Sequence, residues 1–412
     1  MHVRALWNVT RVSHRRSESY RWILRIGLAL IAALVSVMQP GMASAAAVRT
    51  VNSIADTTDG VCDAASCTLR EALQVAGNGD TIVFSSLFDV PQVIQLTSAL
   101  PNINANLTIT GPGALLLTVR RNSGGNYRIF YVTAGTVNIS GLTLENGSAP
   151  DFGGAILSYG LLTVTDVNVF GNTAAISGGG IAAVFNSVTI DRTTVSGNSA
   201  PAGQAGGIYF QNLVQGTLRN STITGNSGGQ GGGVVNRNDA DPAGSPLTII
   251  NSTIVDNRGS GAGGVLALTG AIVTNTLQNS IVANNSTPNV ANQGGGSTTT
   301  SLGNNLTSDS GNGLLTAANG DLVNTDPLLL PLATNGGQTL TRLPNLQSPA
   351  VEGGSNSGAP ATDARGVSRP QNSKADIGAV ELRPLLVSIA ASSGPGSLND
   401  AITAANNRWR GQ

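Results

Sequence analysis

Short segments in which apolar and polar positions alternate repeat along the middle of the chain, between about residues 136 and 286. Each segment ends in an Asn, and consecutive Asn lie 26–31 residues apart. The runs are four to six residues long and rich in Val, Ile, Thr and Leu, which predicts β-strands. The Asn residues that end the segments are Asn146, Asn172, Asn198, Asn226, Asn257 and Asn285.

The length of this repeat indicates a parallel β-helix in which one unit forms one coil of short strands. A helical repeat is excluded because no unit has a helical period, and a propeller blade needs roughly 40 residues or more. The sequence therefore predicts an all-β solenoid whose coils stack about 4.8 Å apart.

Glycine pairs and the terminal Asn residues mark the corners of the predicted coils. Gly206-Gly207 before Ile208 is one example of such a pair. Glycine permits positive φ, and Asn also tolerates the left-handed region. If the six Asn stack in register, their amides form an internal hydrogen-bonded ladder, so we assign them a structural role.

Residues 1–45 have the pattern of a signal peptide. Six arginines precede an apolar run from Ile26 to Met38, and Ala43-Ser44-Ala45 is a small-residue cleavage site. An uncleaved signal anchor is the alternative. We expect a monomeric chain that is exported, either secreted or at the cell surface, without a transmembrane segment after the leader.

Removal of this leader changes the charge and the available chemistry. The remaining chain has 16 basic and 21 acidic side chains, a net charge of −5, which argues against nucleic-acid binding. Both histidines, His2 and His14, are in the leader. This excludes a Ser–His–Asp triad, a Cys–His dyad and a His-ligated metal from the exported chain, and no catalytic residue is predicted.

Residues 48–84 predict a separate N-terminal unit: a strand, an acidic loop, a short helix and a second strand. Thr68 and Glu71 have the spacing of a capping box at the start of the helix. In an exported protein, Cys62 and Cys67 are expected to form a disulfide. No cofactor is predicted apart from calcium at the loop acids, for which a solvated turn is the alternative; these acids are Asp56, Asp59 and Asp63.

The string CTLREA at Cys67–Ala72, preceded by DGVCD and followed by GDTIVF, resembles the CSLREA-type N-terminal domain of bacterial exported β-helix proteins. This resemblance implies that the helix caps the open end of the solenoid. The string GGAI at Gly153–Ile156 is similar to repeats of chlamydial-type polymorphic outer-membrane proteins and other right-handed β-helices. The resemblance implies a right-handed parallel β-helix of the pectin-lyase-like fold over residues 85–325.

Residues 326–382 resemble the choice-of-anchor Q module of bacterial surface proteins. The resemblance rests on Thr325–Leu329, the turn Gly336–Thr339, Ser348–Ala350, Thr362–Gly366, Arg369-Pro370 and Asp376–Glu381. This stretch holds the densest charges of the chain, namely Asp363, Arg365, Arg369, Asp376 and Glu381. These charges form either a carboxylate site or ion pairs that close the C-terminal end of the solenoid. Residues 385–412 echo the N-terminal unit without its following strand, and are interpreted as a truncated second cap.

Two groups of side chains are candidates for ligand binding. An inserted loop after Arg237 contains Asp239 and Asp241, and such loops often hold binding sites. A basic and aromatic cluster suits an anionic sugar, with a solvated coil face as the alternative; it contains Arg120, Arg121, Tyr127, Arg128 and Tyr131.

These features favour an exported surface or extracellular protein with an adhesive or structural role, whose partner is a polysaccharide or the cell envelope. The alternative is a polysaccharide lyase or glycoside hydrolase of the pectin-lyase-like fold, since this fold includes such enzymes. We favour the non-enzymatic interpretation because the acids of the coils do not recur at one repeat position beside an arginine. A calcium-dependent module assembled through its acidic caps is a third class.

Overall fold

The structure is a computed structural model that describes residues 46–239 and 244–382, with 393–394, 397–399 and 402–403. The predicted leader and most of the predicted second cap lie outside the described residues. The described residues from Ala46 onward form one compact unit. Among the helices in this described part, none is long and apolar enough to cross a membrane.

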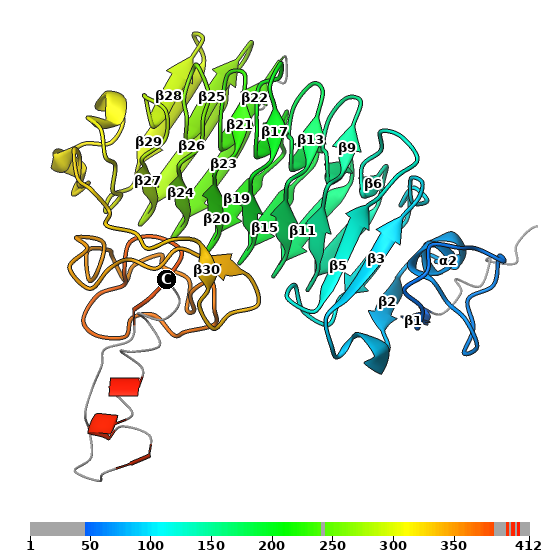
Figure 1. Ribbon diagram of the computed structural model, residues 1–412. Helices are drawn as coiled ribbons and strands as arrows, with labels where there is room; N and C mark the ends of the chain where they lie inside the picture. Colours follow the sequence, from blue (N-terminus) through cyan, green and yellow to red (C-terminus); the bar gives the residue numbers. More distant parts are fainter. Residues whose placement is uncertain (1–45, 240–243, 383–392, 395–396, 400–401, 404–412) are drawn as a thin grey trace, which may run out of the picture. The chain divides into compact units, whose positions relative to one another are not determined.

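The compact unit is a right-handed parallel β-helix, which confirms the predicted fold class. Its strands pair one coil apart in four parallel stacks, which we call sheets A to D (Figure 1). Sheet A runs in the order β1 (Val48–Val51), β2 (Asp80–Phe84), β4 (Leu107–Thr110), β7 (Thr136–Ser140), β11 (Leu161–Thr165), β15 (Val188–Asp191), β19 (Gly216–Arg219), β23 (Ser245–Ile250), β26 (Val273–Gln278) and β29 (Ser297–Ser301).

The other three sheets follow the same rise along the solenoid. Sheet B contains β3 (Gln92–Leu96), β5 (Leu117–Arg121), β8 (Thr143–Glu145), β12 (Asn168–Phe170), β16 (Thr194–Ser196), β20 (Thr222–Thr224), β24 (Thr253–Val255) and β27 (Ile281–Ala283). Sheet C contains β6 (Phe130–Val132), β10 (Ile156–Ser158), β14 (Ile181–Val184), β18 (Ile208–Gln211), β22 (Val234–Asn238), β25 (Val265–Thr269) and β28 (Val290–Gln293). The short sheet D contains β9 (Ser148–Ala149), β13 (Thr173–Ala174), β17 (Ser199–Ala200) and β21 (Ser227–Gly228).

Strand alternation decides which side chains enter the core. Successive side chains of a strand point to opposite faces, so the middle residue of each three-residue strand in sheet B faces inward. These residues are apolar and buried, and they stack in register: Leu144, Val169, Val195, Ile223, Ile254 and Val282. Burial of this stack holds neighbouring coils together.

An asparagine ladder runs through the corner that follows sheet B. The Asn172 amide donates to Asn198 Oδ1 at 3.0 Å, and the Asn198 amide donates to Asn226 Oδ1 at 2.9 Å. Asn257 and Asn285 continue the series with the same geometry. Each ladder oxygen also accepts a backbone N–H from the preceding coil, as between Asn172 and Asn198 at 2.9 Å. The ladder therefore satisfies polar groups that the coils bury.

Asn146 does not belong to this ladder, which corrects the sequence prediction for that residue. Strand register aligns Phe170 with Glu145, so Asn146 aligns with Gly171 and Gly147 takes the ladder position. The N–H of Gly147 donates to Asn172 Oδ1 at 2.7 Å. Asn146 instead occupies the exposed corner, with φ of +59°.

The helix α2 (Leu69–Val75) lies at the N-terminal end of the solenoid (Figure 1). It begins at a capping box in which the Thr68 N–H donates to Glu71 Oε2 at 2.8 Å and the Glu71 N–H donates to Thr68 Oγ1 at 3.1 Å. Cys62 and Cys67 are joined by a disulfide in the preceding loop. A 3₁₀ turn, η1 (Ser86–Phe88), follows β2, and two more, η2 (Gly311–Gly313) and η3 (Ala317–Asn319), follow sheet A.

Residues 326–382, called here the C-terminal segment, pack along the outer face of sheet B. The N–H of Leu340 donates to Asn168 Oδ1 of β12 at 3.2 Å, and its carbonyl accepts from Thr194 of β16. Further along, the Ala379 N–H donates to the Thr253 hydroxyl of β24 at 3.0 Å. The segment therefore covers the side of the solenoid, whereas the ion-pair interpretation of the sequence placed it over the C-terminal end.

The composition of the last strands of sheet B explains this position. Val255 of β24 and Ile281 of β27 are buried against Ala350 and Ile377 of the C-terminal segment. Without this cover, the outer face would expose a contiguous apolar patch to water. The segment also contains an antiparallel strand pair, β30 (Ala333–Thr334) and β31 (Leu340–Thr341).

Candidate functional site

The outer face of sheet C contains a row of aromatic side chains, and we call Tyr131, Tyr159 and Phe185 the aromatic row. They come from three successive coils, in or directly after β6, β10 and β14. The ring centroids of Tyr131 and Tyr159 are 6.1 Å apart in an edge arrangement, and those of Tyr159 and Phe185 are 6.2 Å apart and nearly parallel. The row therefore presents connected aromatic surface along the solenoid axis.

The row is partly covered: Tyr131 and Tyr159 are half-buried and pack against a buried outward-facing cluster of sheet C, and Phe185 is the most exposed member. Leu157, Tyr209 and Leu266 point outward from sheet C but are buried. Phe152, in the loop after β9, stacks on the Tyr209 ring at 5.7 Å. Phe185, in contrast, is 56% exposed.

Phe185 adopts an unusual backbone conformation, with φ of +68°. Bulky residues rarely enter the left-handed region, and such outliers concentrate at functional sites. Its N–H donates to the Gln211 carbonyl at 3.0 Å, which keeps it in the coil-to-coil hydrogen-bond pattern. At the corresponding position of the next coil, Asn212 adopts φ of +52°. Phe185 thus occupies a position with positive φ, for which Asn212 of the next coil is better suited.

Charged side chains lie at or beyond the two ends of the aromatic row. The Arg128 guanidinium lies 4.8 Å from the centroid of the Tyr131 ring, a cation–π distance, and is ion-paired with Asp151. Two coils beyond Phe185, Asp239 pairs with Arg237 and accepts from the Gln211 amide. Polar groups beside flat aromatic faces are suited to a ligand that has both apolar faces and hydroxyl groups.

Tyr159 and Tyr209 remain neutral phenols in the physiological range. The pKa of Tyr159 is raised, mainly by burial and to a smaller extent by the nearby Tyr131 and Asp151. Burial also raises the pKa of Tyr209 to about 12. The hydroxyl of Tyr159 is thus able to donate a hydrogen bond to a ligand at neutral pH.

The structure divides the predicted basic and aromatic cluster among three places. Arg128 and Tyr131 lie on the outer face of sheet C. Arg120 is at the end of β5, where it pairs with Glu145 at 2.7 Å, and the Arg121 guanidinium donates to the Asn146 carbonyl at 2.7 Å.

Tyr127 is buried, so it is not available to a ligand as the cluster prediction required. Its hydroxyl is 2.8 Å from the Leu96 carbonyl and 2.6 Å from the Ser123 carbonyl. Asp239 lies two coils beyond the aromatic row, and Asp241 lies outside the described residues.

The predicted calcium candidates do not converge on one point in the structure. Asp56 forms an ion pair with Arg70 at 2.8 Å. Asp59 and Asp63 each accept backbone N–H groups of their own turn, and the bonds from Ser66 and Ala65 lower the pKa of Asp63. Asp59 and Asp63 thus have the geometry of solvated turns, whereas Asp56 is held in a buried ion pair.

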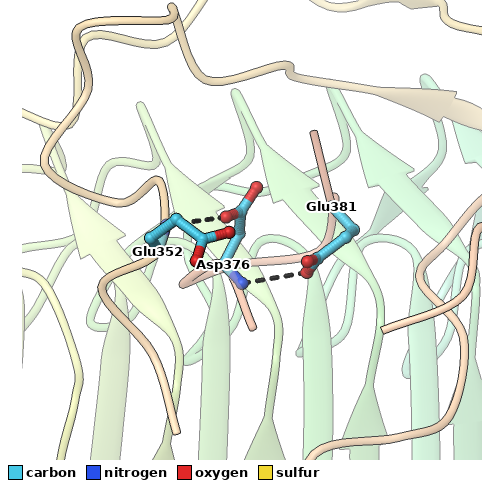
Figure 2. A group of neighbouring side chains, drawn as sticks. All are labelled: Glu352, Asp376 and Glu381. Atoms are coloured by element: carbon cyan, nitrogen blue, oxygen red, sulfur yellow. Dashed lines mark hydrogen bonds between the residues drawn. The ribbon is translucent and has the colours of Figure 1, made fainter. Parts of the chain in front are cut away.

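The metal-compatible acidic cluster of the described residues is instead in the C-terminal segment (Figure 2). Carboxylate oxygens of Glu352, Asp376 and Glu381 lie within 4.8 Å of one another. Glu381 Oε2 accepts the Asp376 N–H at 2.9 Å, and Asp376 Oδ1 accepts the Glu352 N–H at 2.8 Å. Glu381 also pairs with Arg369 at 2.8 Å, with both side chains almost fully buried.

Protein donors therefore occupy this cluster, which favours the ion-pairing interpretation over a carboxylate site. Asp363 pairs with Arg365 at 2.9 Å in the same segment. Burial is the main reason that the pKa of Asp376 is raised to about 6, although N–H groups of Leu382 and Glu352 oppose it. Sequence reasoning did not identify Glu352 as a member.

Comparison with solved structures finds a similar β-helix in the crystal structure of pectate lyase Pel9A. The TM-score is 0.53 at 14% sequence identity, over 83% of this chain and 98% of that chain. No protein-family model and no curated protein matches the chain. The similarity shows that the fold is the pectin-lyase-like right-handed β-helix.

Sequence reasoning missed Tyr159 and Phe185, although the repeat contains a signal for them. Tyr131, Tyr159 and Phe185 are separated by 28 and 26 residues, close to the coil lengths of 26 (Phe130 to Ile156) and 25 (Ile156 to Ile181) that the strand register gives. Aromatic residues at the period of a solenoid are expected on one face in adjacent coils.

Proposed function

We propose that this chain is an exported surface or extracellular protein that binds polysaccharide through the aromatic row and has an adhesive or structural role. The observation that carries the proposal is the connected ring surface of Tyr131, Tyr159 and Phe185 along the solenoid axis. An extended sugar chain offers apolar ring faces to such a surface and hydroxyl groups to its polar margins. We take the ligand of this row to be a neutral polysaccharide, because Arg128 and Arg237 are already paired with acids.

The predicted leader supports export, as do the resemblances to the CSLREA-type domain and the choice-of-anchor Q module. The C-terminal segment would then be the surface-associated module, with its buried ion pairs as its structural core. We propose the same division of the chain as the sequence suggested: 1–45 leader, 48–84 cap, 85–325 coils, 326–382 module and 385–412 second cap. Cleavage after Ala45 in a bacterial host, read by N-terminal sequencing, tests the leader.

A lyase or hydrolase of the same fold is the second candidate, favoured by the similarity to a pectate lyase. The acid and arginine groups of the coils argue against it. Arg192 pairs with Asp166 at 2.9 Å and with Asp191 at 3.0 Å. The bond to Asp166 is the main cause that raises the pKa of Arg192, so this arginine is unsuited to accept a proton from a substrate.

Binding of the full-length chain to a panel of neutral polysaccharides tests the proposal. We expect Tyr159→Ala and Phe185→Ala each to weaken binding by about tenfold, because each removes a stacking surface. Phe170→Ala is the matched control, since Phe170 is a similarly exposed aromatic on sheet B.

Loss of affinity in Phe170→Ala equal to that in Phe185→Ala would contradict a specific aromatic row. The absence of binding to every neutral polysaccharide would contradict the proposed ligand. The same mixtures are assayed for unsaturated uronides and reducing ends, and turnover of any polysaccharide would replace the adhesive function with the enzymatic one.

A further inference from the structure

An open surface cavity of about 640 Å³ lies at the corner between sheets B and D, away from the aromatic row of sheet C. Its lining contains only Gly, Ser, Asn, Asp and Arg residues. Ser227, Arg258 and Asn284 line it from three successive coils, and Ser227 pairs in register with Arg258. A lining without apolar side chains does not suit an apolar ligand or peptide.

These three side chains are exposed to solvent and open to a ligand. Within the described residues, the side chains of Ser227, Arg258 and Asn284 form no hydrogen bond or ion pair. Every other arginine in the part of the chain that the structure describes donates to a carboxylate or a carbonyl; these are Arg49, Arg70, Arg120, Arg121, Arg128, Arg192, Arg219, Arg237, Arg342, Arg365 and Arg369.

The charge of the cavity is favourable for an anion. Asp256 also lines it, but its carboxylate pairs with Arg342 of the C-terminal segment. The positive charge of Arg258 is thus left without a partner. Asn257 and Asn285 contribute their amides to the ladder and are not free to bind a ligand.

We propose that this corner cavity, defined by Ser227, Arg258 and Asn284, binds the anionic group of an acidic saccharide. A guanidinium can form two parallel hydrogen bonds to a carboxylate, and it also binds sulfate oxygens. The Ser227 hydroxyl and the Asn284 amide both donate and accept, which matches sugar hydroxyl groups beside the anion. The three coils rise about 4.8 Å each, so the ligand extends along the solenoid axis. This second site does not require the aromatic row.

Calorimetric titration of the full-length chain at low ionic strength tests the proposal with polygalacturonate, dextran sulfate and dextran. We expect binding of at least one anionic polymer in this cavity, and the two anionic arms show whether it takes carboxylate or sulfate. Arg258→Gln should weaken that binding by about tenfold or more, because it removes charge-assisted hydrogen bonds. Ser227→Glu places a negative charge next to Arg258 and should produce a similar loss.

Arg219→Gln is the matched control, because it makes the same charge change on sheet A and leaves Asp191 paired with Arg192. It should change the affinity by less than about twofold, because long-range charge effects are small beside a direct contact. If Arg219→Gln and Arg258→Gln lost equal affinity for the anionic polymer, the effect would come from net charge alone, and the proposed site would be overturned. Unchanged affinity in Arg258→Gln, or no binding to either anionic polymer, would overturn it as well. Phe185→Ala should retain anionic binding, which separates this result from a failure of the aromatic row.

Discussion

The phenyl ring of Phe185 stacks on the ring of Tyr159, with centroids 6.2 Å apart and planes inclined by 21°. Phe185 reaches this position with φ of +68°, a conformation that is unfavourable for its side chain. Phe185 therefore combines an unfavourable backbone conformation with an exposed aromatic side chain. That combination distinguishes this residue from the buried aromatic residues of the core, such as Phe130 and Phe210.

Phe185→Asn is expected to stabilise the fold while it weakens polysaccharide binding. Asn tolerates the left-handed region, and Asn212 already adopts it in the next coil. Relief of the strain should raise the free energy of unfolding by about 1 kcal/mol, as judged from the usual cost of such outliers. Denaturant unfolding measures the gain, and the binding titration measures the loss.

The reverse change, Asn212→Phe, provides the comparison for this prediction. It places a bulky residue at a positive φ without the Tyr159 contact, so we expect it to destabilise the protein. A Phe185→Asn protein that was less stable than the wild type would show that the ring contact outweighs the strain.

Asn198→Ala should destabilise the protein by about 3 kcal/mol, because it leaves buried polar groups of neighbouring coils without partners. Asn198 accepts from the amide of Asn172 and donates to Asn226 Oδ1. Thermal and denaturant unfolding measure the loss.

Asn146→Gly is the control for the ladder register. Asn146 is exposed at the position that Gly171 takes in the next coil, so we expect a change of less than about 1 kcal/mol. If Asn146→Gly and Asn198→Ala lowered the free energy of unfolding equally, Asn146 would belong to the ladder, as the sequence predicted.

The wrong assignment of Asn146 to the ladder shows why the period of the repeat could be predicted from the sequence but the register of its coils could not. Corners accept Gly or Asn almost equally, so an Asn-Gly pair can be aligned in either order with Gly171-Asn172. The inward apolar residues resolve this, since Leu144 aligns with Val169. Alignment by core positions is therefore more reliable than alignment by corner residues.

The aromatic row was harder to predict because local preferences oppose it. Phe has little tendency to adopt a positive φ, so no rule of turn chemistry places Phe185 beside Tyr159. The position of the C-terminal segment depends on contacts between distant parts of the chain. Its hydrogen bonds from Leu340 to Asn168 and from Ala379 to Thr253 join residues that no local pattern relates.

Asp376 should make stability depend on pH between about pH 4 and 6. Burial raises its pKa in the folded state to about 6, above its ordinary value of 3.8. The folded protein therefore holds this proton more tightly than the unfolded chain does. The resulting stabilisation is complete below about pH 4 and is lost as the pH rises through about 6. The free energy of unfolding of wild type minus that of Asp376→Asn should fall across this window.

Glu352→Gln is the control of opposite sign. Burial alone would raise the pKa of Glu352, but hydrogen bonds from Lys374, Ser373 and Asn372 together lower it. A carboxyl group whose pKa is lowered on folding stabilises the fold when the pH is above the ordinary pKa of the group. This stabilisation is lost as the pH falls. The difference between wild type and Glu352→Gln should thus grow as the pH rises. Parallel trends in the two variants would refute the assignment of Asp376.

Arg369→Met should be strongly destabilising, because it leaves Glu381 as an uncompensated charge in the interior. The two side chains are 1% and 0% exposed and form an ion pair at 2.8 Å. Removing one partner of a buried pair typically costs about 3–5 kcal/mol. The double variant Arg369→Met, Glu381→Gln should recover part of this loss, because a neutral amide costs less to bury than a carboxylate. Denaturant unfolding of both variants at pH 7 measures the loss of stability. The fluorescence of a dye that binds exposed apolar surface shows whether the outer face of sheet B becomes uncovered. A double variant as unstable as the single one would show that the Arg369 contacts to the carbonyls of Asp376 and Gly378 hold the segment in place.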